Sequence, residues 1–245
     1  MDFRVDIFVQ ALTSKALREG AWITITLTFA SFALGALLGL LVAVLRGNRF
    51  RVVRAGAWTY IWVFRAVPTL IQLIFIWNAL PQLIPATREP WFTSFLAATI
   101  ALALNEGAYA AEVIRGGLLS IDDGQRLAAR ALGMPPWSVF RRVIVPQLIR
   151  VVTPTMANDL ITMLKITSLA YVMSLQEILT NATSQVSVSF RFAEWYLAAA
   201  VYYLVLVSIL MVVQAWLERR YAWTSQGSAS AGQSRMARLR GIAAR

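Results

Sequence analysis

The stretch AWITITLTFASFALGALLGLLVAVL, residues 21–45, contains no charged residue. A helix needs about 20 predominantly apolar residues to cross the hydrocarbon core of a bilayer, and this stretch is longer than that. It therefore predicts a transmembrane helix. We expect the chain around it to be an all-α integral membrane protein.

The composition of the whole chain supports the same class. Of its 245 residues, 58% are hydrophobic and 14% are charged, whereas a soluble domain has about 45–50% and about 25%. A soluble fold of this length could not bury so much apolar surface. The chain has no Cys and no His, which removes thiol and imidazole catalysis and the usual zinc ligands.

Four further apolar segments follow the first one, which gives five predicted spans. The second predicted span carries Arg65, and we expect Pro81 and Pro85 to end it. The last segment is uncharged. From residue 222 the composition becomes rich in Ser, Gly and Gln, which predicts a flexible cytoplasmic tail over 222–245. The five predicted spans are 21–45, 57–80, 91–115, 151–175 and 195–217.

The distribution of Lys and Arg predicts the orientation. Sixteen of these residues follow the first, third and fifth spans, five lie on the opposite face, and Arg65 and Lys165 lie within spans. Basic residues accumulate in cytoplasmic loops, so we expect the N-terminus outside and the C-terminus in the cytoplasm. The net charge of +11 is explained in the same way, and no nucleic-acid partner is expected.

The connection between the third and fourth spans is long enough to have a structure of its own. Ser120 to Asp123 resembles a capping box, and Gly133 suits the left-handed position that ends a helix. Pro135 and Pro136 can open a second helix over 137–145, which we expect Pro146 to end. We predict a compact cytoplasmic helix-turn-helix, residues 120–146, that serves as a docking surface.

The third span contains a row of residues with helical spacing: Asn105, Tyr109, Glu112 and Gly116. They share one face, and Glu112 lies three residues before Arg115, with which it could pair. Two interpretations stay open: a buried ion pair that fixes helix packing, or a contribution to a transport path.

The fourth span has a second polar row: Thr155, Asn158, Thr162 and Lys165, with Asp159 beside it. Such a row does not face lipid, so we expect it to face a second subunit or a water-filled route. The first span has Gly35 and Gly39 on the side of Thr24, Thr28 and Ser31. We expect these small residues to serve packing within the chain rather than dimerisation.

Several motifs resemble those of bacterial ABC importer permeases. Ala128-Ala129, three residues, Gly133, nine residues and Val143-Ile144-Val145-Pro146 match the spacing of the EAA loop of that family. The stretches 64–70, 108–117 and 164–169 are similar to its polar amino acid branch. The resemblance covers about residues 20–221. Two positions depart from the pattern: Leu127 stands where the family has Glu, and Ile166 where Asp is common.

This resemblance implies a type I ABC importer transmembrane fold over residues 1–221 and a role as permease for a polar amino acid or related compound. It implies two permease subunits, identical or homologous, in the bacterial cytoplasmic membrane. It also implies two ATP-binding subunits that dock on the EAA loops, and an external solute-binding protein. The implied coupling residues are Leu127, Ala128, Ala129, Gly133 and Pro146. The candidate residues of the path are Arg65, Asn105, Tyr109, Glu112, Asn158, Thr162 and Lys165.

The chain has no P-loop: neither Lys15 nor Lys165 lies in a Gly-Lys-Ser/Thr sequence. We therefore expect no cofactor in this chain, and expect ATP and Mg to bind a partner subunit. The alternative functions are an ATP-independent carrier or channel and an intramembrane enzyme. Five spans without a visible inverted repeat disfavour the carrier, and the lack of paired catalytic groups disfavours the enzyme.

Overall fold

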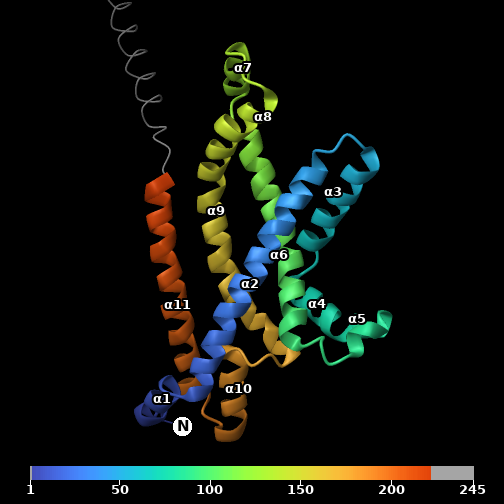
Figure 1. Ribbon diagram of the computed structural model, residues 1–245. Helices are drawn as coiled ribbons and strands as arrows, with labels where there is room; N and C mark the ends of the chain where they lie inside the picture. The colour runs from blue at the N-terminus through green and yellow to red at the C-terminus, as the bar shows by residue number, and fades with distance from the viewer. Residues whose placement is uncertain (1, 222–245) are drawn as a thin grey trace, which may run out of the picture.

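Four long helices run through the molecule in the computed structural model, which describes residues 2–221 (Figure 1). They are α2 (Lys15–Arg46), α6 (Ser94–Leu119), α9 (Val145–Ile166) and α11 (Phe192–Tyr221). The described residues form no strand. The prediction of an all-α fold is confirmed.

Shorter elements complete the fold, and most of them lie toward the two ends of the long helices, while α3 runs beside α2. Figure 1 places the α2–α3 turn, the α7–α8 pair and the C-terminal end of α11 at its upper end, and α1 and α10 at its lower end. The shorter elements are α1 (Val5–Leu12), α3 (Arg51–Ala66), α4 (Thr69–Ile74), η1 (Phe75–Ala79), α5 (Leu80–Leu83), η2 (Pro85–Arg88), α7 (Asp123–Ala131), α8 (Pro136–Val139), η3 (Phe140–Ile144), η4 (Thr167–Met173) and α10 (Ile178–Ser189).

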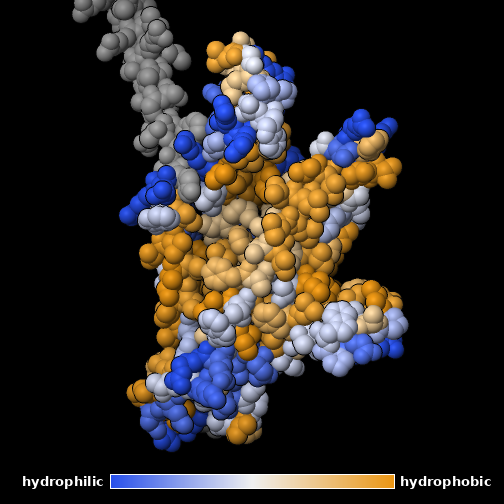
Figure 2. Space-filling view, in the orientation of Figure 1, coloured by the Kyte–Doolittle hydropathy of each residue, from blue (hydrophilic) through white to orange (hydrophobic). Residues whose placement is uncertain are grey.

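Within residues 2–221, two helices are long and apolar enough to cross a membrane: α2, with a mean hydropathy of 2.3, and Phe192–Arg220 of α11, with 2.4. A third span results if the bent pair of Arg51–Ala66 and Thr69–Leu83 is counted as one. Figure 2 shows an apolar belt between two polar ends, as expected for a protein in a bilayer. The structure thus has two to three apolar spans, while α6 and α9 carry ionisable residues along their length.

The packing of α2 against α6 confirms the predicted use of the small residues. The side chains of Thr24, Thr28 and Ser31 are fully buried. A Cβ on Gly35 would lie 2.5 Å from the Cβ of Glu106, and one on Gly39 would lie 2.5 Å from the Cβ of Ala110. The two helices therefore approach closely enough to require glycine, and the contact lies within the chain.

The predicted second span, 57–80, is not one continuous helix. The chain breaks at Val67 and Pro68, and α3 and the helical run that starts at Thr69 are bent by 105°. Pro68 lacks an N–H and biases the preceding residue toward extended backbone, and Val67 indeed has φ −82° and ψ 129°.

The prediction that Pro81 ends this helix was wrong. The helical run continues through Pro81 and ends at Leu83, before Pro85. Just before Pro81, η1 forms a π turn in which the Leu80 N–H donates to the Phe75 carbonyl. The wider π turn changes the bonding pattern where the proline N–H is missing and relieves the clash of its ring with the preceding turn.

The prediction that Pro146 ends a loop helix at Val145 was also wrong, and a π turn again explains why. The helical path runs from Pro136 through η3 into α9, so Pro146 is the second residue of α9. Again a π turn precedes the proline, and the Val145 N–H donates to the Phe140 carbonyl. The predicted fourth span, 151–175, likewise begins inside α9 and ends beyond it, in η4 and the turn after it. The predicted tail, 222–245, lies outside the described residues.

Candidate functional site

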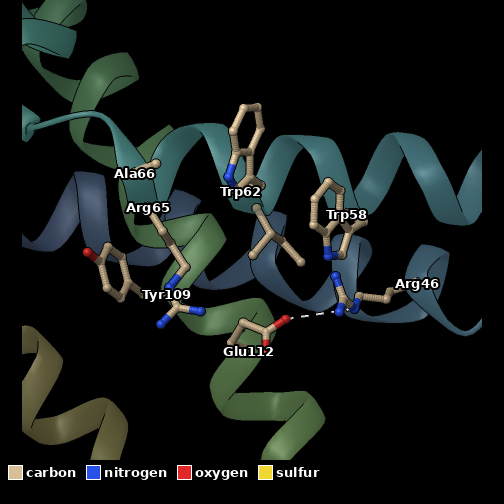
Figure 3. A pocket seen from close by; sticks show the side chains of 8 residues that line it. Arg46, Trp58, Trp62, Arg65, Ala66, Tyr109 and Glu112 are labelled. Atoms are coloured by element: carbon tan, nitrogen blue, oxygen red, sulfur yellow. Dashed lines mark ion pairs between the residues drawn. The ribbon is translucent and has the colours of Figure 1, made fainter.

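A hollow of about 420 Å³ opens between α2, α3 and α6 (Figure 3). Three predicted path residues line it: Arg65 from the last turn of α3, and Tyr109 and Glu112 from α6. Arg46, at the end of α2, completes its charged lining. Trp58, Ile61, Trp62 and Ala66 complete the wall.

One carboxylate in this hollow meets several guanidinium groups. Glu112 accepts hydrogen bonds from Arg115 Nε at 3.1 Å and Nη2 at 2.7 Å, and its Oε1 lies 3.7 Å from Arg46 Nε. The Arg65 guanidinium carbon lies 5.3 Å from the centre of the Tyr109 ring, a cation–π arrangement. The predicted Glu112–Arg115 pair is confirmed, and the hollow is left with an excess of positive charge.

Asn105 does not line this hollow, although it was predicted on the same helical face. It is buried, and its Nδ2 donates to the Phe64 carbonyl at 3.1 Å and to Gln72 Oε1 at 3.2 Å. In an unbroken helix the Phe64 carbonyl would accept from residue 68, but Pro68 has no N–H. Asn105 thus supplies a bond that the break removes, which is a structural role.

Gln72 has the same role and was missed in the sequence. Its Nε2 donates to the carbonyls of Phe64 at 2.9 Å and of Val67 at 2.8 Å. Unsatisfied backbone groups are costly inside a membrane, so these bonds allow the break to exist there. The available signal was an amide side chain four residues after Pro68, within a mostly apolar run.

The predicted polar row on α9 is exposed in this chain. Thr155, Asn158, Thr162 and Lys165 all lie on the open side of the helix. Among the described residues, no ion pair involves Lys165. The structure thus places Arg65, Tyr109 and Glu112 in the hollow and Asn158, Thr162 and Lys165 on the open face of α9, while Asn105 is buried at the helix break.

Two carboxylates with a buried oxygen, the buried Glu106 and the half-buried Asp159, were not selected as site residues. Glu106 is 5% exposed, and its Oε1 has no hydrogen-bond partner in the described part of the chain. The same holds for Asp159 Oδ2 and for the buried Oγ of Ser31. These residues belong to α6, α9 and α2, which pack against one another. The sequence signal was an ionisable residue inside an apolar segment.

The loop 120–146 folds as a small helical element at one end of the molecule (Figure 1). Gly133 has φ +74°, as predicted for the residue that ends a helix. The Gly133 N–H donates to the Arg130 carbonyl and the Met134 N–H to the Ala129 carbonyl, at 2.9 and 3.1 Å. These two bonds form a Schellman motif.

The predicted N-cap of this loop was wrong. Asp122, rather than Ser120, caps α7, and its Oδ1 accepts from the Gly124 N–H at 2.6 Å. Ser120 is instead the C-cap of α6, and its hydroxyl donates to the Gly117 carbonyl at 2.8 Å. The reason is that α6 continues to Leu119, beyond the predicted end of the third span.

The coupling residues point in two directions. Leu127 and Ala128 are exposed, whereas Ala129 is 5% exposed and packs with Ile121, Val139 and Ile144 in the core of the loop. Four large apolar side chains of the loop are exposed, and the three most exposed are Leu127 at 65%, Leu132 at 81% and Trp137 at 69%, followed by Phe140. Leu132, Trp137 and Phe140 were not predicted, and with Leu127 they expose apolar side chains at a charged end of the molecule.

Comparison with known proteins identifies the family. Residues 35–223 match the model of the binding-protein-dependent transport system inner membrane component family. The chain is 37% identical to the arginine transport system permease protein ArgU of Corynebacterium glutamicum, covering 93% of this chain and 75% of the relative. It is 35% identical to the glutamine transport system permease protein GlnP of Escherichia coli, covering 83% and 92%.

A solved structure agrees with this result. The crystal structure of an amino acid ABC transporter with histidines superposes with a TM-score of 0.81 at 33% identity, covering 89% of this chain and all of that chain. The methionine transporter MetNI has the same fold, with a TM-score of 0.68 at 21% identity. The chain belongs to the binding-protein-dependent transport system inner membrane component family.

Proposed function

We propose that this chain is the membrane-spanning permease subunit of an ATP-driven importer for a polar amino acid or a related compound. Its family membership, together with the amino acid permeases and transporter that it resembles, carries this proposal. The positive hollow beside Arg65 supports it, because an amino acid carries a carboxylate that such a pocket can attract. The deciding experiment is uptake of radiolabelled amino acids into liposomes that contain the purified complex, with and without ATP.

The proposed topology has five spans, with α6 and α9 among them, in the bacterial cytoplasmic membrane. The α2–α3 turn, the α7–α8 loop and the C-terminal end of α11, which all carry basic residues, lie at one end of the molecule in Figure 1, and this supports a cytoplasmic end. The test uses single Cys residues at Thr87, Ser138 and Ser228, because the chain has none of its own. An impermeant thiol reagent on intact cells should label only Thr87→Cys, and labelling of Ser138→Cys would refute the topology.

We further propose that two such permeases form the path, each contributing one half. The open polar face of α9 supports this, because a second subunit could cover Asn158, Thr162 and Lys165 and enclose a polar route. An external binding protein would deliver the solute. Crosslinking between Cys residues introduced at Thr162 in two subunits would support the pairing, while its absence in an active complex would contradict it.

Two ATPase subunits are proposed to dock on the loop 120–146 and to bind ATP and Mg. The exposed apolar side chains Leu127, Leu132 and Trp137 support this, because apolar surface on a polar end marks an interaction site. Leu127 would replace the charged contact of the usual Glu with an apolar one. Gly133 and Pro146 would set the direction of the helices that carry this surface.

Gly133→Val tests the coupling role. A Cβ at φ +74° costs about 1–2 kcal/mol, so the two loop helices should change their relative angle while the spans stay inserted. No atom lies within 4 Å of the position of that Cβ, so any effect arises from the backbone. We expect weaker co-purification of the ATPase and loss of solute-stimulated ATP hydrolysis. Unchanged association and hydrolysis would remove the loop from the mechanism.

A further inference from the structure

A second basic hollow, of about 590 Å³, lies between the ends of α2, α3 and α6. Four arginines line it, Arg46, Arg51, Arg54 and Arg115, and no acidic residue is among its lining residues. Trp58 and Ala55 complete the wall. Nothing in the proposed transport cycle uses Arg51 or Arg54.

The arginines of this hollow have fewer acidic partners than guanidinium groups. Glu112 is the acidic partner of Arg46 and Arg115, and within residues 2–221 neither Arg51 nor Arg54 makes an ion pair. One nitrogen of Arg46, Nη1, is buried and has no hydrogen-bond partner among the described residues. Four guanidinium groups, only two of which have an acidic partner, leave a site that suits an anion with several oxygens.

The backbone adds donors at the same place. Arg51 is the first residue of α3, a helix of 16 residues whose N-cap, Phe50, makes no side-chain capping bond. The first N–H groups of a helix have no partner within the helix and attract phosphate. Arg51 and Arg54 therefore place two guanidinium groups beside an uncapped helix N-terminus.

Next to this hollow, α3 carries two exposed tryptophans, Trp58 and Trp62, which also line the first hollow. Trp58 and Trp62 are 51% and 58% exposed and stack with parallel planes, their ring centroids 6.0 Å apart. Tryptophan prefers the boundary between headgroups and acyl chains. Figure 2 shows polar atoms at the α2–α3 turn above an apolar flank.

We propose that this hollow binds the phosphate of an anionic phospholipid, such as phosphatidylglycerol, whose acyl chains run along Trp58 and Trp62. Basic pockets between transmembrane helices bind such headgroups, and the combination of a phosphate site with an apolar flank fits a lipid better than an acidic protein surface. In Figure 1 the turn is separate from the α7–α8 loop that is proposed to contact the ATPase. With the proposed topology the lipid belongs to the cytoplasmic leaflet, and only this placement rests on the proposed function.

The test measures lipid binding to the purified transporter complex by native mass spectrometry, with phosphatidylglycerol and phosphatidylcholine of the same acyl chains. The double variant Arg51→Gln/Arg54→Gln removes two exposed guanidinium groups. An arginine near a membrane surface contributes about a factor of five in affinity, so we expect a roughly 30-fold loss for phosphatidylglycerol and none for phosphatidylcholine. If the double variant gives no complex, each single variant should show about a 5-fold loss.

The matched control is Arg219→Gln/Arg220→Gln at the end of α11, which removes the same charge from an exposed site outside the hollow. The affinity of this control for phosphatidylglycerol should stay within about 2-fold of wild type. That change is smaller than the roughly 5-fold loss expected when one arginine of the hollow is removed. An equal loss in both double variants would show diffuse attraction and overturn the site, as would equal binding of the two lipids.

Two further measurements distinguish a bound lipid from free phosphate and from a protein surface. Displacement of phosphatidylglycerol by an excess of inorganic phosphate, with no preference for the lipid, would overturn a lipid site. Loss of ATPase co-purification from Arg51→Gln/Arg54→Gln, with lipid binding intact, would show a protein interface instead. ATP-driven uptake measured on the same preparations tests the transport function separately, so either proposal can fail while the other stands.

Discussion

Gly39→Ala tests the close approach of α2 to α6. A Cβ at this position would lie 2.5 Å from the Cβ of Ala110, 2.9 Å from the Ala111 nitrogen and 3.0 Å from the Gly107 carbonyl oxygen. Two of these atoms belong to the backbone of α6, so no side chain can rotate away. The added methyl group must push the two helices apart.

The expected change in the free energy of unfolding is the difference between two opposing contributions. Overpacking of this kind costs about 1–3 kcal/mol, while replacing Gly by Ala in a helix contributes about 0.5–1 kcal/mol in the opposite direction. The net loss is about 0–2.5 kcal/mol, which lowers the midpoint of thermal unfolding of a chain of this size by up to roughly 10 °C. Relative to a Gly→Ala control without the clash, the loss is the full overpacking cost of about 1–3 kcal/mol.

Gly56→Ala in α3 and Gly116→Ala in α6 are the controls, because no atom lies within 4 Å of a Cβ at either position. They keep the favourable helix term without the clash, so their midpoints should equal or exceed that of wild type. The assay heats the purified complex in detergent and follows the folded fraction by size-exclusion chromatography. If Gly39→Ala is as stable as the two controls, α2 and α6 do not make this contact, and the packing argument fails.

Three further predictions concern acidic residues. Glu177 is fully buried and accepts from the Leu179 and Thr180 amides and from the Thr180 and Tyr203 hydroxyls, so Glu177→Ala should cost about 2–4 kcal/mol in the same assay. The exposed control Glu19→Ala should change stability by less than about 0.5 kcal/mol, and equal effects would contradict this role. Glu177 lies between η4 and α10, beyond the predicted fourth span. Its burial raises its pKa, and this effect outweighs its hydrogen bonds, which lower the pKa. Because the folded state then holds the proton more tightly, stability should fall as the pH rises from the unfolded to the folded pKa, and Glu177→Gln should abolish this pH dependence of the midpoint. Glu112→Ala strands the Arg46 and Arg115 guanidinium groups, so complex yield, amino acid uptake or both should drop; normal values of both would make the carboxylate peripheral.

Local features of the sequence determined much of this protein. The uncharged run 21–45 lies within α2, and the predicted Glu112–Arg115 pair forms because it depends only on helical spacing. Gly133 takes positive φ because only glycine does so without cost. The small residues of α2 are buried because a helix with small residues along one side can pack closely against another helix.

Tertiary structure decided the features in which distant residues meet. Pro68 breaks its helix because Asn105, from another helix, and Gln72 satisfy the freed Phe64 carbonyl, whereas Pro81 and Pro146 are accommodated by π turns. Proline is the same residue in all three places. Its effect depends on which partners the fold supplies for the backbone groups that it leaves unpaired, and those partners are not visible in the local sequence.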